Sequence, residues 1–138
     1  GVTYSPAPHF DLDEEYDPQE NVINLVRDKK IVSAHDISEG GLFVTLIESC
    51  MRRNMGVDIT TDSSIRKDAF LFGEAQSRVV VSVAASQAAD FEASLDSQKF
   101  FKLGTVKGDG HIRVDGDDWG NIKGWKQAYD EAIEKLMA

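Results

Sequence analysis

The clearest pattern along the chain is an apolar stripe at helical spacing between residues 42 and 54. Its members are Leu42, Phe43, Leu46, Ile47 and Cys50. Side chains at these spacings share one face of a helix, which must be buried against another element. The pattern therefore predicts an amphipathic helix over 42–54, with Cys50 as a packing residue rather than a nucleophile.

Capping signals and shorter apolar stripes predict three further helices. The first begins at Asp17, which can cap the helix, followed by Pro18 in the first turn and Glu20 as the partner in a capping box. A second helix, over 87–96, would bury Phe91 among other residues.

The last helix is expected from 122 to 137, with Asn121 as its N-cap. Helical spacing assigns it an inward face that consists of Trp125, Ala128 or Tyr129, Ala132, Ile133 and Leu136.

Strands are predicted where β-branched residues concentrate. They cover 31–34, 56–59, 78–83, 100–106 and 111–114. The turn Lys107-Gly108-Asp109-Gly110 separates the last two, so 100–114 is expected to form a hairpin. Hairpins mixed with strand–helix units predict an α+β domain, a mixed sheet covered by helices.

Length, charge and cysteine content narrow the class of protein. The 138 residues suit one domain, and we expect residues 1–16 to form a linker or extended arm and 17–138 the domain. A net charge of −9 argues against binding to nucleic acid or to an anionic membrane surface. The single cysteine excludes an intrachain disulfide.

No apolar run is long enough for a membrane span and no secretory leader opens the chain, so a cytoplasmic protein is expected. Because the chain begins with Gly1 rather than Met, we expect a segment cut from a longer protein.

The most informative segment is SAHDISEGGL at 33–42, which joins a predicted strand to the helix over 42–54. A helix N-terminus exposes unpaired N–H groups, and glycine lets a phosphate approach the backbone. The turn from Ser38 to Gly41 is therefore a candidate anion cradle, and the alternative is a capped turn that needs glycine for its geometry. Asp36, at the end of the strand, is a candidate for capping or for ligand contact.

The second segment is LFGEAQSR at 71–78. Glu74, Gln76 and Arg78 alternate, so an extended chain would direct all three to one side. They could bind a sugar or an amide, or they could form an internal salt-bridge network.

Other catalytic and metal motifs are not found. The run Asp115-Gly116-Asp117-Asp118-Trp119-Gly120 fails as a calcium loop, because Lys126 stands where a bidentate glutamate is required, and it is interpreted as a solvated turn. No catalytic residue and no metal ligand is assigned within the chain.

Together, the segments 33–42 and 71–78 resemble the last domain of phosphoribosylformylglycinamidine synthase, the C-terminal domain shared by the AIR synthase-related family. The closing segment from Trp125 to Tyr129 resembles the end of the non-fused form of that enzyme. The likeness covers residues 17–138. The wider superfamily, which includes aminoimidazole ribonucleotide synthetase and selenophosphate synthetase, shares the fold with different motifs.

The resemblance implies a three-layer α/β/α arrangement, partly ferredoxin-like, with a four-stranded mixed sheet. It also implies a role in an ATP-dependent amidoligase of purine biosynthesis, which converts formylglycinamide ribonucleotide and glutamine-derived ammonia to the amidine. ATP and magnesium would serve the full-length enzyme, and this domain alone would bind neither. Implied partners are an upstream ATP-binding domain of the same polypeptide and a glutaminase subunit or domain. The catalytic histidine of the family lies upstream of this segment.

When the family's motifs are matched to this sequence, the resemblance implies four candidates for the phosphate or nucleotide side of a binding site. They are Asp36, Ser38, Gly40 and Gly41. The second motif implies that Glu74, Gln76 and Arg78 either face a ligand or form an internal salt-bridge network. The family often has aspartate in place of Glu39 and serine in place of Ala75, and Ala75 lacks the hydroxyl contact that serine could make.

Two functional hypotheses follow. The chain either helps to form a nucleotide or ribonucleotide site of the amidoligase, or it is a non-catalytic scaffold, with at most a structural nucleotide, that supports the active half and docks the glutaminase. A third alternative is the equivalent domain of another ATP-dependent enzyme of the superfamily. In each case the isolated domain is expected to be inactive.

Overall fold

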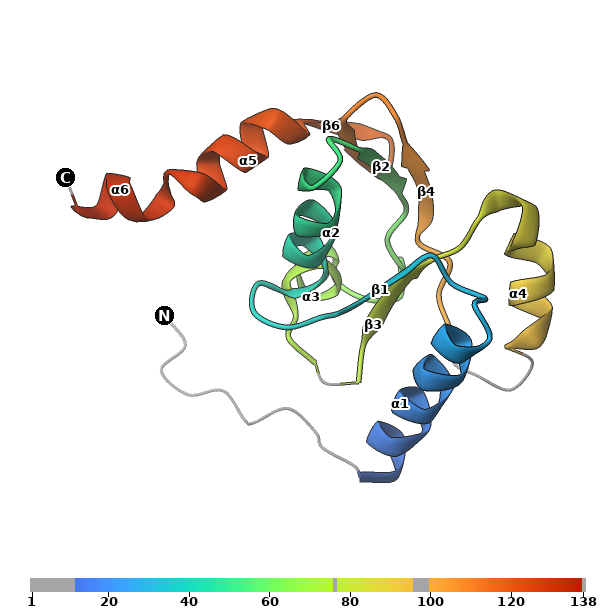
Figure 1. The fold of residues 1–138 in the computed structure, drawn as a ribbon. Helices are drawn as coiled ribbons and strands as arrows, with labels where there is room; N and C mark the ends of the chain where they lie inside the picture. The colour runs from blue at the N-terminus through green and yellow to red at the C-terminus, as the bar shows by residue number, and fades with distance from the viewer. Residues whose placement is uncertain (1–11, 76, 96–99, 138) are drawn as a thin grey trace. The chain divides into compact units, whose positions relative to one another are not determined.

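A computed structural model describes residues 12–75, 77–95 and 100–137 of the chain (Figure 1). Its elements are, in order, α1 (Leu12–Arg27), β1 (Ser33–Asp36), α2 (Gly41–Met51), β2 (Gly56–Ile59), α3 (Lys67–Phe72), β3 (Val79–Ser82), the short 3-10 helix η1 (Ala85–Gln87), α4 (Ala88–Ser94), β4 (Gly104–Lys107), β5 (His111–Val114), β6 (Asp117–Asn121), α5 (Ile122–Asp130) and α6 (Ala132–Met137). They group into two compact units. Unit 1 takes residues 1–39 and 74–99, and unit 2 takes residues 40–73 and 100–138.

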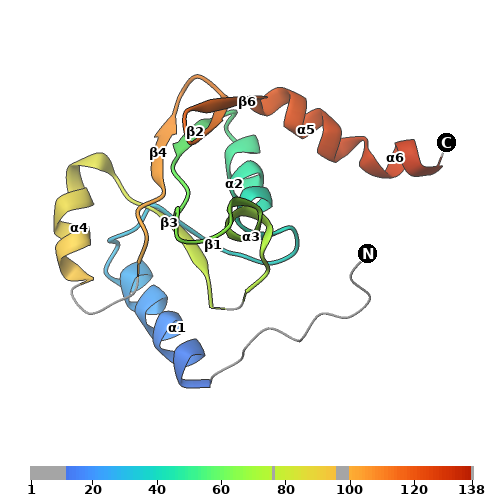
Figure 2. The same cartoon turned by 180° about the vertical axis from the view of Figure 1, so that it is seen from behind.

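Unit 1 is built around the antiparallel pair β1 and β3, which lie side by side in both views (Figures 1 and 2). The register places Ser33 opposite Ser82 and Asp36 opposite Val79. Valines 79–81 supply the β-branched residues that favour an extended backbone, as the sequence predicted. The expected strand over 31–34 is observed two residues later, at Ser33–Asp36.

The first helix begins earlier than expected, inside the segment 1–16 that was expected to form a linker or extended arm. Helix α1 starts at Leu12, so residues 12–16 are helical, and residues 1–11 lie outside the described part. Pro18 is consequently inside the helix rather than in its first turn, where proline is tolerated best.

Unit 2 contains the mixed four-stranded sheet, in the order β4-β2-β5-β6. Strands β2 and β5 run parallel, whereas β4 and β6 are antiparallel to their neighbours. The central strands bury Val57 and Ile59 beside Ile112 and Val114, all on one face. The apolar stripe of α2, from Leu42 to Cys50, is buried as predicted. The α+β class with a mixed four-stranded sheet is therefore confirmed.

Aromatic rings join four elements of unit 2 around Phe43 on α2. Its ring centroid lies 5.6 Å from that of Phe72, 5.2 Å from Trp119 and 5.1 Å from Trp125. These partners come from α3, β6 and α5 respectively. Helix α3 was not predicted, because residues 60–68 are polar and the helix is only six residues long.

The predicted hairpin over 100–114 is wrong. Strands β4 and β5 do occur on either side of residues 108–110, but β2 lies between them and bonds to both. The distant segment Gly56–Ile59 takes this place because it buries apolar side chains on the core face of the sheet. The hairpin is instead formed by β5 and β6.

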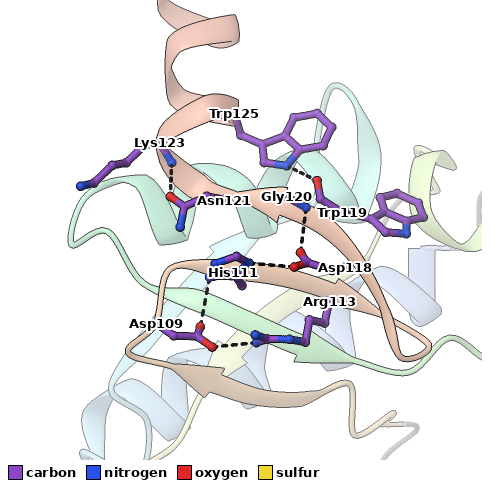
Figure 3. A network of polar contacts seen from close by, with 9 residues as sticks. All are labelled: Asp109, His111, Arg113, Asp118, Trp119, Gly120, Asn121, Lys123 and Trp125. Carbon is purple, nitrogen blue, oxygen red and sulfur yellow. Dashed lines mark hydrogen bonds and ion pairs between the residues drawn. The ribbon is translucent and has the colours of Figure 1, made fainter.

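The predicted solvated turn over 115–120 is also corrected, because Asp117–Asn121 forms strand β6. Side-chain bonds hold this polar strand (Figure 3). His111 Nδ1 lies 2.9 Å from Asp118 Oδ2, and the Gly120 N–H donates to Asp118 Oδ1 at 2.9 Å. Trp125 Nε1 donates to the Trp119 carbonyl at 3.0 Å.

The last predicted helix is correct at its start and wrong on its inward face. Asn121 accepts a bond from the Lys123 N–H at 3.1 Å, which is the expected N-cap. The helix is interrupted after Asp130, and the expected inward residues Tyr129, Ile133 and Leu136 are 56%, 71% and 87% exposed. The first part of this segment does pack in unit 2, through the Trp125 ring against Phe43.

Candidate functional site

The two sequence segments meet inside unit 1, where β1 and β3 pair. Asp36 lies opposite Val79, and the next N–H, that of Ile37, donates to the Arg78 carbonyl at 2.9 Å. Ser38 and Ser77 are the next residues beyond this bond, one on each segment. We call Asp36, Ser38, Ser77 and Arg78 the strand-end cluster. The antiparallel pairing thus unites residues that are about 40 positions apart in the sequence.

The members of the strand-end cluster differ in burial. Asp36 and Ser38 are exposed, whereas Ser77 and Arg78 are half-buried. Burial lowers the pKa of the Arg78 guanidinium from its ordinary value, although arginine keeps its charge at neutral pH. His35 is half-buried next to the exposed Asp36, as strand alternation requires, so these neighbours do not form a catalytic pair. The cluster therefore combines the guanidinium of Arg78 with the carboxylate of Asp36 and two serine hydroxyls.

The predicted alternation of Glu74, Gln76 and Arg78 along one extended strand is not observed. Strand β3 begins only at Val79, and Ser77 adopts a left-handed conformation with φ of 60°. A left-handed residue is not extended, so the period-two alternation of a strand does not continue through Ser77. Glu74 is exposed, and Gln76 lies outside the described residues.

The two glycines of the candidate anion cradle belong to unit 2, at the start of α2. Gly40 is the N-cap, with φ of 82°, and no side chain caps this end. Gly41 has φ of 69°. Both values lie in the left-handed region, which glycine occupies at little cost.

Gly41 has a packing reason to be glycine. A Cβ built on it would lie 2.7 Å from the Phe72 carbonyl carbon and 2.9 Å from the Leu71 carbonyl oxygen. The end of α3 therefore presses against the start of α2, so the two sequence segments meet in unit 2 as well. This contact supports a structural role for Gly41, and the role of its N–H as an anion donor stays a prediction.

Ser77 is the residue that the motif analysis did not select. It combines a left-handed backbone with a buried hydroxyl oxygen that has no hydrogen-bond partner among the described residues. A serine between Gln76 and Arg78 carries no sequence signal of strain, so only the structure could find it.

Neither a metal centre nor a reactive thiol is found in the part of the chain that the structure describes. No group of three or more His, Cys, Asp or Glu side chains is placed there to hold a metal ion. Cys50 is buried, and burial raises the pKa of its thiol to about 11, which keeps it protonated at neutral pH. None of the helices described is long and apolar enough to cross a lipid bilayer.

Known proteins resemble the chain in sequence. Residues 7–117 match the family described as AIR synthase related protein, C-terminal domain. The phosphoribosylformylglycinamidine synthase subunit PurL of Salinibacter ruber is 47% identical over 94 residues, which are 67% of this chain and 12% of that protein. The subunit PurL of Leuconostoc mesenteroides is 39% identical over 105 residues, 76% of this chain and 14% of that protein. The chain thus spans about one eighth of the length of these relatives.

Solved structures agree on the fold. T. maritima PurL complexed with FGAR superposes with a TM-score of 0.66 and 18% identity, covering 79% of this chain and 20% of that one. T. maritima PurL complexed with ATP gives a TM-score of 0.65 at 18% identity, covering 77% of this chain and 20% of that one. At this identity, the likeness establishes the fold.

Proposed function

The chain belongs to the AIR synthase related protein C-terminal domain family, and from this premise we propose that it is the C-terminal domain of a phosphoribosylformylglycinamidine synthase. The parent enzyme would convert formylglycinamide ribonucleotide, ATP and glutamine-derived ammonia to the amidine, ADP and phosphate in purine biosynthesis. The observation that carries the proposal is the 47% identity to the Salinibacter ruber subunit PurL over 94 residues.

Within that reaction, this chain would contribute binding groups and not the chemical step. The strand-end cluster offers a guanidinium and two serine hydroxyls, which can donate to phosphate oxygens, and the Asp36 carboxylate, which can accept from a sugar hydroxyl. The described residues contain no group of acidic side chains placed to hold magnesium, so we assign metal and ATP activation to the upstream domain. A cytoplasmic location, the upstream ATP-binding domain and a glutaminase partner are parts of the same proposal.

The test is the substrate profile of the full-length protein that contains this chain. With ATP and an ammonium salt, we expect ADP release that depends on formylglycinamide ribonucleotide. An enzyme that instead consumes ATP with the amidine product, and closes its ring, would belong to the neighbouring superfamily member and would overturn the proposal. The ammonium salt removes any need for the glutaminase partner in this assay.

The scaffold hypothesis is favoured by one observation, the contact of Gly41 with the end of α3. Because that contact makes any side chain at 41 destabilising, a substitution there cannot separate a cradle from a scaffold. Ser38→Ala is the better variant, because Ser38 is exposed and its loss should spare the fold. A scaffold predicts unchanged KM values for both substrates in Ser38→Ala, whereas a binding role predicts a raised KM for one of them.

A further inference from the structure

The last two helices, α5 and α6, carry the most exposed large apolar side chains among the described residues. Leu136, Met137 and Ile133 are 87%, 83% and 71% exposed, and Tyr129 on the same segment is 56% exposed. We call these four residues the C-terminal face. Exposed apolar side chains are ordinary when they are scattered, whereas a continuous group of them is typical of a contact with another protein surface.

Helical geometry makes the C-terminal face continuous. Hydrogen bonds run through the break between the two helices, because the Glu131 N–H donates to the Gln127 carbonyl at 3.0 Å and the Lys135 N–H donates to the Glu131 carbonyl at 3.0 Å. Positions 129, 133, 136 and 137 are therefore i, i+4, i+7 and i+8 of one helical path and share a side. The opposite side is polar, since Glu131 accepts from Gln127 at 2.7 Å and pairs with Lys135 at 2.8 Å.

The same apolar stripe begins inside unit 2, where it is covered. Ile122 is 1% exposed, and the Trp125 ring lies 5.1 Å from that of Phe43. The Tyr129 hydroxyl donates to Glu48 Oε1 on α2 at 3.2 Å, which fixes the direction of α5. Helix α6 continues this direction away from α2 (Figures 1 and 2). Because helices gain most of their stability from packing of the apolar face, the second half of the segment lacks the packing that the first half has.

The family match and the charge of the segment narrow what can cover it. The match ends at residue 117, before α5 and α6, so the C-terminal face lies outside the part of the domain that the family model describes. Residues 122–137 hold three lysines and three acidic residues and are neutral, whereas the whole chain has a charge of −9. A neutral apolar face suits an apolar protein surface. A second copy of the chain or an anionic membrane would repel the rest of this acidic protein.

The length of the relatives indicates where such a surface lies. The chain spans 12% of the Salinibacter ruber relative and 14% of the Leuconostoc mesenteroides relative, so most of each of those polypeptides lies outside the matched region. A surface on the same polypeptide is present at a high effective concentration, because the connecting chain keeps it near.

We propose that the C-terminal face packs against an apolar surface of the preceding part of the same polypeptide and so holds this domain in place in the full-length enzyme. The inference rests on the proposed function, because that function makes this chain the last domain of a longer polypeptide.

A photo-crosslinker on the C-terminal face of the full-length enzyme identifies its neighbour directly. Leu136→benzoylphenylalanine keeps an apolar side chain there and adds a reactive ketone. Glu134→benzoylphenylalanine is the matched control, because it places the same group on the polar side of α6. After irradiation, peptide mass spectrometry should locate the crosslink from position 136 in residues that precede this chain. Position 134 should give no crosslink to those residues.

Two glutamine variants of the full-length enzyme test the packing without a crosslinker. Ile133→Gln and Glu134→Gln introduce the same side chain at adjacent positions on opposite sides of α6. Ile133→Gln should loosen the contact, so that peroxide oxidises Met137 about fivefold or more faster than in the wild type. Glu134→Gln should leave the rate of Met137 oxidation within about twofold of the wild type.

The inference is overturned by a crosslink from position 136 that stays within this chain, by a crosslinked dimer, or by the absence of any crosslink. It is also overturned if Met137 of the native wild type is oxidised as fast as in the urea-unfolded enzyme. If the crosslink reaches the preceding residues but the enzyme shows no turnover with formylglycinamide ribonucleotide, the proposed function fails and the docking surface stands. The two failures are thereby distinguished.

Discussion

At the residue scale, close backbone approach decides where a glycine is required. Gly41 must lack a side chain because its Cα faces the Leu71–Phe72 backbone, whereas a Cβ at Gly124 in α5 would meet no other atom within 4 Å. Both glycines lie in helices and both look like weak points by helix propensity alone. Their opposite surroundings lead to opposite expectations for the same substitution.

Gly41→Ala is expected to destabilise the domain by about 2–4 kcal/mol, because it adds a positive-φ penalty to a clash with rigid backbone. The matched control Gly124→Ala should instead stabilise it by up to about 1 kcal/mol, the propensity difference in an open helical position. Urea unfolding of both variants measures the two effects. A Gly41→Ala protein as stable as the wild type would show that the contact between α2 and α3 is not close.

Burial also separates two apolar residues that the helical pattern treats alike. Leu46→Ala should cost about 2–5 kcal/mol, because Leu46 is 7% exposed on the packed face of α2. Ile133→Ala should change stability by less than about 0.5 kcal/mol, because Ile133 is 71% exposed on α6. Equal losses at the two sites, measured by denaturant titration, would mean that α6 packs in the isolated domain after all.

At the element scale, the Asp115 carboxylate in the β5–β6 turn forms hydrogen bonds with the loop before α3. Asp115 Oδ1 accepts from the Thr61 N–H at 2.7 Å, Oδ2 accepts from the Thr61 hydroxyl at 2.9 Å, and Lys67 Nζ lies 2.9 Å from Oδ2. The backbone bond from Thr61, followed by the bond from Lys67, lowers the pKa of Asp115 from 3.8 to about 2. Lys67 also lies over the Trp119 ring, 5.4 Å from its centroid.

This pKa shift predicts a specific acid dependence. The folded state holds the ionised form, so the contribution of Asp115 is complete above its ordinary pKa of 3.8 and is lost as the pH falls through about 2. The melting temperature of the wild type should exceed that of Asp115→Asn by a constant amount near neutral pH, and the difference should shrink in acid. Asp117→Asn supplies the control, because it removes one carboxylate at an exposed position two residues away. A gap between wild type and Asp115→Asn that stays undiminished down to about pH 2 would contradict the assigned role.

Local patterns predicted the elements whose partners are near in sequence or whose faces are strongly apolar. The stripe of α2 and the cap at Asn121 are local signals, and the structure confirms both. Strand β6 was missed because its residues are poor strand formers, and the bond between Asp118 and His111 that supports it forms only in the folded hairpin. The place of β2 between β4 and β5 depends on tertiary packing, which no local window contains.

The candidate site was predictable to a similar degree. The segments 33–42 and 71–78 were identified by their motifs, but their pairing through Asp36 and Val79 required the fold. Ser77 could not be selected, because its positive φ and unsatisfied hydroxyl are properties of the folded chain. Motif positions thus indicated the region, and the structure indicated which residue there is strained and unsatisfied.

At the scale of the whole molecule, we propose that this chain is a binding part of a larger enzyme. The chain spans 12% of the Salinibacter ruber relative, and we assign the chemical step to segments outside it. The isolated chain is accordingly expected to show no conversion of formylglycinamide ribonucleotide in the presence of ATP and ammonium. Turnover by purified residues 1–138 alone would refute this division of labour.

The binding role of this domain is best tested by kcat/KM of the full-length enzyme with Arg78→Lys, measured for formylglycinamide ribonucleotide and for ATP. Lysine keeps the charge of Arg78 but loses the planar fork that binds two oxygens at once. A binding role predicts a fall of about tenfold or more for one substrate. Unchanged kcat/KM for both substrates, in a preparation whose wild type is active, would contradict that role and leave this domain as a scaffold.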